Sequence, residues 1–141
     1  MSKPIFVDAN IIMYVVGSEH PLRQPCQDAL SRITGGEIQA VVSCEIHQEI
    51  LHRYTAIHHP DKACQVSQKL EIAIPHTLPV TMQDITRARE LLKHYPTLPA
   101  RDLLHVAVML NNGITQILSA DTHFDQVEEV ERLAPAFFAA E

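Results

Sequence analysis

IFVDAN, residues 5 to 10, is an apolar run that ends on a carboxylate, Asp8, and has an amide two positions later, Asn10. A short, continuously apolar run bounded by Pro4 and Asp8 is typical of a parallel strand that is covered on both faces. Capping of the following helix is the simplest role for Asp8 and Asn10. The alternative is that the strand end supplies one ligand of a metal site and that later segments supply the others.

The rest of the chain alternates between short apolar runs and segments with helical spacing. Further strands are predicted at IQAVVS (38–43), within IPHTLPV (74–80) and at ITQILSAD (114–121). Helices are predicted over NIIMYVVG (10–17), within HPLRQPCQDALSRITGG (20–36), from the N-cap Ser43, from Pro60, from the N-cap Thr81 and over ARDLLHVAVMLNNG (100–113). This alternation predicts a three-layer α/β/α sandwich with a mostly parallel central sheet. The chain has 141 residues, the length of one domain, so residues 1–141 are predicted to form a single domain.

Composition and charge argue against several classes of protein. Three cysteines without a C-x-x-C pair suggest neither a disulfide framework nor a zinc knuckle. No apolar run approaches the ~18 residues that a membrane span requires, and the N-terminus lacks the apolar core of a secretory signal, so we expect a cytoplasmic protein with no membrane partner. With 11 Lys and Arg against 17 Asp and Glu, the formal charge of −6 argues against a broad basic face for nucleic acid. An acidic protein can still cut nucleic acid if cations lie between its carboxylates and the phosphate.

Strand-end carboxylates are predicted to meet in one site. Asp8 follows the strand IFV and Asp121 follows ILSA, and the carboxyl ends of parallel strands lie at one edge of the sheet, where ligands bind. Either residue alone is commonly a helix cap, but two of them, each after a buried strand, favour a shared site. Asp102 is a further candidate because it opens the most hydrophobic helix of the chain, where a carboxylate is costly unless a cation or donors balance it. The alternative for Asp102 is a first-turn acid that faces the helix dipole.

A fourth acid lies on the helix that starts at Ser43. Glu45 and Glu49 are about 40° apart at helical spacing, so on geometry alone either could point inward. Carboxylates around one crevice repel each other and take up protons unless a cation lies among them. An all-oxygen ligand set suits Mg²⁺ or Mn²⁺, and the absence of paired Cys and His ligands disfavours zinc. Such a site supports the in-line attack of water on a phosphodiester.

Three segments together resemble the successive motifs of the PIN-domain ribonucleases, in particular the VapC-type toxins of bacterial and archaeal toxin–antitoxin pairs. The segments are FVDANIIMY, VVSCEIHQEIL and RDLLHVAVMLNNGITQILSADTHFD. Each motif alone is weak, but the order and spacing of the motifs from about Pro4 to Pro135 are specific. The resemblance implies a PIN-like fold and an Mg²⁺-dependent (or Mn²⁺-dependent) endoribonuclease, the toxin of a type II pair. It also implies an RNA substrate, a cognate antitoxin protein that blocks the site, and a homodimer.

The resemblance implies that four acids bind the metal ion and take part in catalysis, namely Asp8, Glu49, Asp102 and Asp121. It selects Glu49 over Glu45 because the family acid lies six residues after a strand-ending serine, here Ser43, and precedes an aliphatic pair. Asn10 and Ser119 match supporting positions of the site.

The chain departs from the family pattern at His123, where many members have a last acid. The sequence therefore leaves open whether one or two ions bind, and Asp125 is close enough along the chain to replace the missing acid. His105 is expected to be a packed or hydrogen-bonded residue rather than a general base. Arg53 and Arg101 are the best candidates for contacts with phosphate, and the alternative for each is an ordinary surface ion pair.

Two alternatives remain. The first is a catalytically weakened PIN-like binding module, which the departure at His123 permits. The second is another α/β phosphoryl-transfer protein with a strand-end Asp. A phosphatase of that kind needs a second Asp two residues after Asp8, where Asn10 stands, and a receiver domain needs a late lysine, whereas no lysine follows Lys93.

Overall fold

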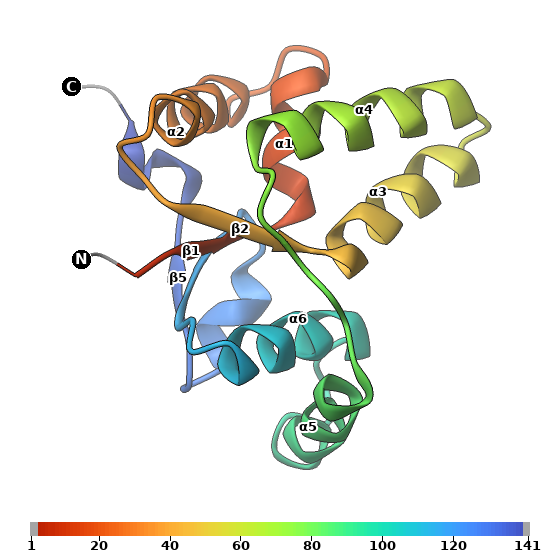
Figure 1. Ribbon diagram of the computed structural model, residues 1–141, viewed down its shortest axis with the longest axis vertical. Coiled ribbons are helices and arrows are strands. Elements are labelled where there is room, and N and C mark those ends of the chain that lie inside the picture. The colour runs from red at the N-terminus through yellow and green to blue at the C-terminus, as the bar shows by residue number, and fades with distance from the viewer. Residues whose placement is uncertain (1–2, 140–141) are drawn as a thin grey trace.

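The computed structural model describes residues 3–139, and a five-stranded sheet lies between two layers of helices (Figure 1). The strands are β1 (Ile5–Val7), β2 (Ala40–Ser43), β3 (Thr77–Leu78), β4 (Gln116–Leu118) and β5 (Glu131–Leu133). The helices are α1 (Ala9–Val16), α2 (Arg23–Thr34), α3 (Cys44–Ala56), α4 (Pro60–Ala73), α5 (Met82–His94) and α6 (Ala100–Asn111), and the short 3₁₀ turns are η1 (Thr122–Gln126) and η2 (Pro135–Phe138).

The winding of the sheet reverses next to its central strand. The strand order is β3-β2-β1-β4-β5, and the neighbouring strands pair in parallel. The chain moves outward from β1 through β2 to β3 and then returns to β4 on the other side of β1. Because parallel crossovers are right-handed, α1 to α4 cover one face and α5 and α6 cover the other, as Figure 1 shows. The predicted three-layer sandwich is confirmed, and the reversal between β1 and β4 creates a crevice at the carboxyl edge.

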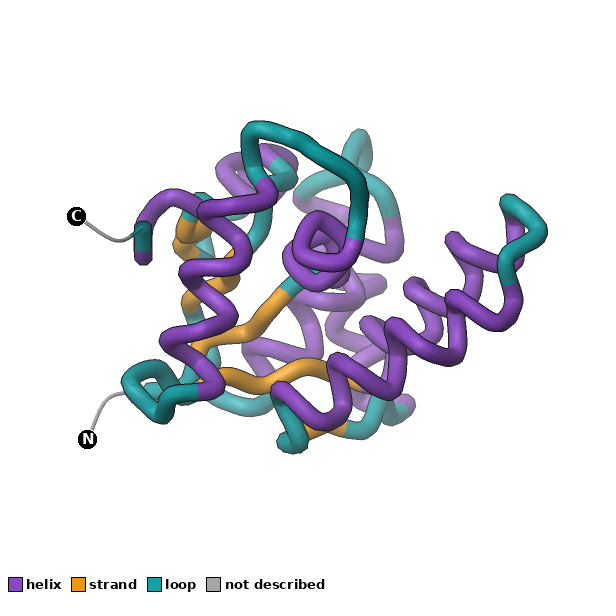
Figure 2. The backbone as a smooth tube through the Cα atoms, turned by 90° about the horizontal axis from the view of Figure 1, so that it is seen from above, coloured by secondary structure: helices purple, strands orange, loops and turns teal. Residues whose placement is uncertain are grey.

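β1 lies in the middle of the sheet because its side chains are apolar on both faces. Phe6 pairs in register with Val41 of β2 and with Ile117 of β4, and all three side chains are buried. The run IFV is therefore a strand covered on both faces, as predicted from the sequence. On the face of the sheet that α1 to α4 cover, α3 and α4 run side by side and extend away from the strands (Figure 2).

The predicted helix starts at Ser43, Pro60 and Thr81 are confirmed. The Ser43 hydroxyl accepts a hydrogen bond from the Ile46 amide at 3.3 Å, which caps α3. The Asp84 carboxylate accepts a bond from the Thr81 amide at 2.8 Å and so holds the first turn of α5. Within residues 3–139, no helix combines the length and the hydrophobicity that crossing a bilayer requires.

Replacement of Asp84 by alanine is expected to lower the free energy of unfolding by about 2 kcal/mol. Asp84 is buried, and its second oxygen accepts a bond from the Asn111 side chain of α6 at 2.8 Å, so the substitution removes a cap and leaves a donor without its partner. Urea denaturation measures the change. Asp61→Ala is the matched control, because Asp61 is also a first-turn acid but is exposed, and it should change stability by no more than about 0.5 kcal/mol. Equal effects of the two substitutions would contradict this role of Asp84.

Candidate active site

The four acids singled out in the sequence line one cavity at the carboxyl edge of the sheet. The cavity has a volume of about 360 Å³. Its lining residues come from α1, α3, α6 and the strand ends: Asp8, Asn10, Glu49, Arg53, Pro99, Arg101, Asp102, Asp121 and His123. A hollow of about 510 Å³ between α5 and α6 is larger, but Glu90 is the single carboxylate among the described residues that line it. The convergence of four acids, rather than its size, distinguishes the cavity at the carboxyl edge, which we call the acidic cavity.

Asp8 both caps α1 and faces the cavity. One of its oxygens accepts a hydrogen bond from the Ala9 amide at 2.8 Å, which is the capping bond. The other oxygen accepts bonds from the Ser119 hydroxyl at 2.6 Å and from the Asn10 side-chain amide at 3.2 Å. Burial raises the pKa of Asp8 above its ordinary value of 3.8, even though the charge of His105 and the bonds from Ser119 and Ala9 act in the opposite direction. The two roles considered for Asp8, helix cap and metal ligand, are therefore compatible.

Ser119 and Asn10 join the ends of β1 and β4. The Ser119 hydroxyl, which donates to Asp8, accepts bonds from the Asp121 amide at 2.9 Å and from the Asn10 side chain at 3.2 Å. The Asn10 carbonyl oxygen accepts a bond from the Ala120 amide at 3.2 Å. The network fixes Asp8 relative to the segment that carries Asp121, and Asn10 and Ser119, two of the three supporting residues singled out in the sequence, belong to it, whereas Asp125 does not.

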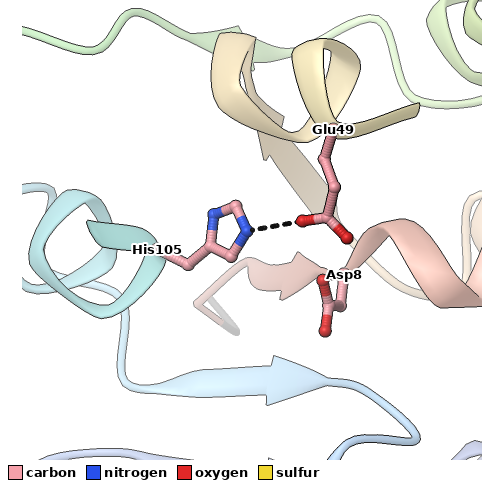
Figure 3. A group of neighbouring side chains, drawn as sticks. All are labelled: Asp8, Glu49 and His105. Atoms are coloured by element: carbon pink, nitrogen blue, oxygen red, sulfur yellow. Dashed lines mark hydrogen bonds and ion pairs between the residues drawn. The ribbon is translucent and has the colours of Figure 1, made fainter. Parts of the chain in front are cut away.

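Glu49 is held by a buried histidine from the opposite layer of helices. The His105 ring nitrogen Nε2 lies 3.2 Å from a Glu49 oxygen, and Figure 3 shows the two side chains converging beside Asp8. Burial acts to raise the pKa of Glu49, but the bond with His105 and the charges of His105 and Arg53 outweigh it, so the pKa lies below its ordinary value. Burial acts to lower the pKa of His105, and the carboxylates of Glu49 and Asp8 outweigh it in turn. The expectation of a packed, hydrogen-bonded His105 is confirmed.

The structure resolves the choice between Glu49 and Glu45 in favour of Glu49 as the inward residue. Ile46 and Ile50 are fully buried, and Glu49 shares their side of α3 and lines the cavity. Glu45 is half-buried and does not contribute to the cavity lining.

Asp102 and Asp121 are bridged by His123. The His123 Nδ1 atom lies 3.0 Å from a carboxylate oxygen of Asp102 and 3.1 Å from one of Asp121. Burial raises the pKa of Asp102, and the bond to Asp102 raises the pKa of the half-exposed His123. The histidine that replaces the family acid thus lies between two of the candidate ligands.

Asp125 lies outside the cavity lining and pairs with an arginine instead. Arg132 of β5 donates to the two Asp125 oxygens at 2.8 and 3.1 Å, and this ion pair lowers the pKa of Asp125. The third guanidinium nitrogen of Arg132, Nη1, donates to the Ser119 carbonyl at 3.0 Å. Arg132 therefore anchors the segment between Ser119 and Asp125, a role that the sequence did not indicate because β5 itself was not predicted.

Two cations lie at the rim of the cavity. Arg53, one turn after Glu49 on α3, is half-exposed, and its guanidinium lies 3.4 Å from the Glu49 carboxylate. Arg101 precedes Asp102 and is exposed. Both side chains line the cavity, and contact with a phosphate group stays a prediction.

Two clusters of side chains are suited to divalent ions. The donor atoms of each cluster lie within 4.8 Å of one another: Asp8, Glu49 and His105 in one, and Asp102, Asp121 and His123 in the other. The imidazole of His105 is already bonded to Glu49, so it orients a carboxylate and leaves oxygen as the donor. A donor set dominated by carboxylate oxygens fits a hard cation such as Mg²⁺ or Mn²⁺. The sequence predicted oxygen ligands alone, and the structure adds an imidazole to each cluster.

The stabilisation that a divalent ion would provide is expected to grow as pH rises above about 4, the ordinary pKa of an aspartate. The pKa values of Asp8 and Asp102 are raised above their ordinary value of 3.8, so in the metal-free protein their contribution to stability is present below that value and is lost as pH rises through the raised values. An ion that binds the ionised carboxylates restores this stability at the higher pH. Thermal unfolding with Mg²⁺ and with EDTA at each pH measures the difference. A difference that stays constant with pH would contradict the placement of the ion beside these carboxylates.

Comparison with known proteins matches this arrangement to one family. The PIN domain family model matches residues 5–130, and these residues contain the whole cavity. The chain belongs to the PIN domain family. The resemblance noted in the sequence is thereby confirmed.

This PIN domain is similar to several proteins named VapC ribonucleases. It is 40% identical over 131 residues to a VapC ribonuclease of Mycobacterium bovis, covering 92% of this chain and 99% of that protein. It is 37% identical over 117 residues to ribonuclease VapC23 of Mycobacterium tuberculosis, covering 83% and 92%.

Solved structures share its fold at low sequence identity. VapBC2 from Rickettsia felis, bound to a promoter DNA fragment, aligns with a TM-score of 0.74 at 10% identity and covers 94% of this chain and 98% of that one. VapC20 of Mycobacterium tuberculosis, described as a toxin that cleaves the sarcin–ricin loop, aligns with a TM-score of 0.68 at 16% identity and covers 90% and 98%.

Proposed function

We propose that this PIN domain is a metal-dependent endoribonuclease and the toxin of a type II toxin–antitoxin pair. The observation that carries the proposal is the convergence of Asp8, Glu49, Asp102 and Asp121 in one cavity at the point where the sheet reverses its winding. The names of the relatives, VapC ribonucleases at 37–40% identity, support the same activity.

The proposed catalytic and metal-binding residues are Asp8, Glu49, Asp102 and Asp121, with Mg²⁺ or Mn²⁺ as the ion. When bound there, a divalent ion lowers the pKa of water and balances charge on the scissile phosphodiester. Since the ion supplies this activation, no side chain has to act as general base.

The supporting residues keep the carboxylates in fixed positions. Donors from the backbone, Asn10 and Ser119 hold Asp8, so its oxygens do not have to reorganise when RNA arrives. The bond from His105 orients Glu49 in the same way. Arg53 and Arg101 at the rim would contact the phosphate that enters the cavity.

Incubation of the purified protein with labelled RNA tests the activity. Cleavage in Mg²⁺ or Mn²⁺, its loss in EDTA, and products that carry a 5′-phosphate are the expected results. Cleavage that persists in EDTA would contradict the metal-dependent mechanism, and an intact RNA pool in every ion tested would contradict the nuclease itself.

A weakened PIN-like binding module is the second candidate, because His123 occupies the space between Asp102 and Asp121. Replacement of His123 by aspartate distinguishes the nuclease from the binding module. A wild-type protein that cuts RNA supports the nuclease, whereas an inactive wild type that gains metal-dependent cleavage in His123→Asp supports the module.

We further propose that residues 1–141 form one PIN-like unit that acts as a cytoplasmic homodimer and is inhibited by a cognate antitoxin. Several structures of similar fold are VapBC or toxin–antitoxin complexes, which supports a protein partner of this type. Sedimentation of the protein alone and with the product of a neighbouring short reading frame tests the proposal. A monomer at all concentrations would contradict the homodimer, and lack of a complex would contradict the inhibition.

A further inference from the structure

A second, smaller pocket lies against the acidic cavity and has different chemistry. It has a volume of about 280 Å³ and is lined by Asn10, Met13 and Tyr14 of α1 and by Arg53 and Tyr54 of α3. Asn10 and Arg53 also line the acidic cavity, so the two spaces adjoin. The remaining lining residues are large and apolar or aromatic. A ligand that places an anionic group in the cavity therefore reaches this pocket with its neighbouring group.

The aromatic side chains of the pocket are held in place before any ligand binds. The Tyr14 ring packs against the His20 ring with the centroids 4.7 Å apart. Tyr54 is 6% exposed, and the Lys62 ammonium lies 5.4 Å from the centroid of its ring. Because these side chains are already fixed, a ligand that binds in the pocket would not have to immobilise them. Two of the three tyrosines of the chain lie here, together with an arginine and a nearby lysine.

The combination of rings, a guanidinium and a small volume matches a single nucleobase. Single-stranded RNA is held by stacking of bases on aromatic rings and on arginine, next to cations that contact the backbone. The volume of about 280 Å³ lies just below the ~300–1,000 Å³ of pockets for drug-sized ligands, which suits one planar base better than an amphipathic helix from a protein partner. The adjoining cavity is the place where the phosphate of the same strand is proposed to lie.

We infer that this pocket is a nucleobase subsite, which stacks a base next to the scissile phosphate on Tyr14 and Arg53, with the buried Tyr54 forming its wall. The inference rests on the proposed function insofar as an RNA strand occupies the cavity. The subsite explains how a chain with a formal charge of −6 would hold RNA, since stacking contributes affinity without net positive charge. It also predicts a preference for the base at one position of the substrate.

Fluorescence of RNA oligonucleotides that carry 2-aminopurine at successive positions tests the subsite. Stacking on an aromatic ring quenches this base, and the signal is read immediately after mixing with the whole protein in Mg²⁺. Quenching at one position is expected for the wild type and for Tyr14→Phe, which keeps the ring. Tyr14→Leu keeps an apolar side chain without a ring, and it should lose the quenching and bind about 10-fold more weakly.

Tyr95 provides the matched control because it lies away from the pocket and bonds with Glu129 at 2.6 Å, so Tyr95→Leu should behave as wild type. Melting curves establish that each variant folds, and Tyr14→Met, which also keeps an apolar side chain without a ring, repeats the comparison should Tyr14→Leu fail to fold. Equal quenching in the Phe and Leu variants, or no quenching at any position, would overturn the subsite.

Cleavage measured on the same samples separates the two proposals. If RNA is cut and no base is quenched, the subsite is wrong and the nuclease stands. If a base is quenched and RNA is not cut, the subsite stands and the nuclease is wrong. If Tyr14→Leu leaves the fluorescence unchanged and weakens only the complex with an antitoxin, the pocket is a protein-docking site and the subsite is again wrong.

Discussion

Asp8→Asn is expected to lower kcat/KM for RNA cleavage by more than about 100-fold, because loss of a partner that merely orients a metal ligand already costs 10–100-fold and Asp8 is itself a proposed ligand. Asparagine has the size of aspartate and can still accept the Ala9 amide bond that caps α1, so the fold should persist. Kinetics on a labelled RNA and a melting curve measure the two effects.

Asp61→Asn is the matched control for this substitution. Asp61 lies in the first turn of α4, is exposed and does not line the cavity, so its neutralisation should leave cleavage unchanged. Wild-type cleavage by a folded Asp8→Asn variant would refute the assignment of Asp8 as a ligand.

Glu49→Gln is expected to reduce kcat/KM by a similar factor, more than about 100-fold, whereas Glu45→Gln should leave it unchanged. The two glutamates lie on the same helix one turn apart, but Glu49 alone of the pair lines the cavity and bonds with His105. Glutamine keeps the length of the side chain and removes the charge that would hold the ion. The comparison is made with the same RNA at several Mg²⁺ concentrations.

The opposite ranking of these two variants would show that the inward position on α3 had been assigned to the wrong residue. An equal and large loss in both variants would instead point to a general requirement for negative charge on α3. Far-UV circular dichroism of each variant distinguishes either result from unfolding.

The sequence predicted the parts of the fold that depend on local pattern. The strand at Ile5–Val7 could be predicted because a short run that is apolar at every position has to be covered on both faces. The meeting of Asp8 and Asp121 followed from the rule that parallel strands end at one edge. The N-caps at Ser43 and Thr81 were predictable because the side-chain chemistry of a cap is local.

The parts that were not predicted depend on neighbours far apart in the chain. β5 has three residues, Glu131 to Leu133, of which Leu133 alone is apolar, and it exists as a strand because β4 lies beside it. The ion pair between Arg132 and Asp125 depends on that strand, so the sequence could suggest Asp125 as a replacement ligand but could not foresee its partner.

The pairings of the two histidines were equally hidden. His105 and Glu49 are separated by 56 positions and meet because α6 and α3 lie on opposite faces of the sheet near the same edge. Helical spacing left Glu45 and Glu49 equivalent, and the burial of Ile46 and Ile50 is what turns Glu49 inward. A motif therefore identified the residue types, whereas the tertiary fold determines which of them face one another.

The proposed mechanism depends most on the binding of a divalent ion in the acidic cavity. Titration of the purified protein with Mn²⁺, followed by the loss of the free-ion signal in electron paramagnetic resonance, measures this binding without reference to RNA. The wild type and the Asp61→Asn control are expected to bind Mn²⁺ with the same affinity, and Asp8→Asn is expected to bind it at least about 10-fold more weakly. Equal binding by the wild type and a folded Asp8→Asn variant, or no binding by the wild type, would contradict the central claim.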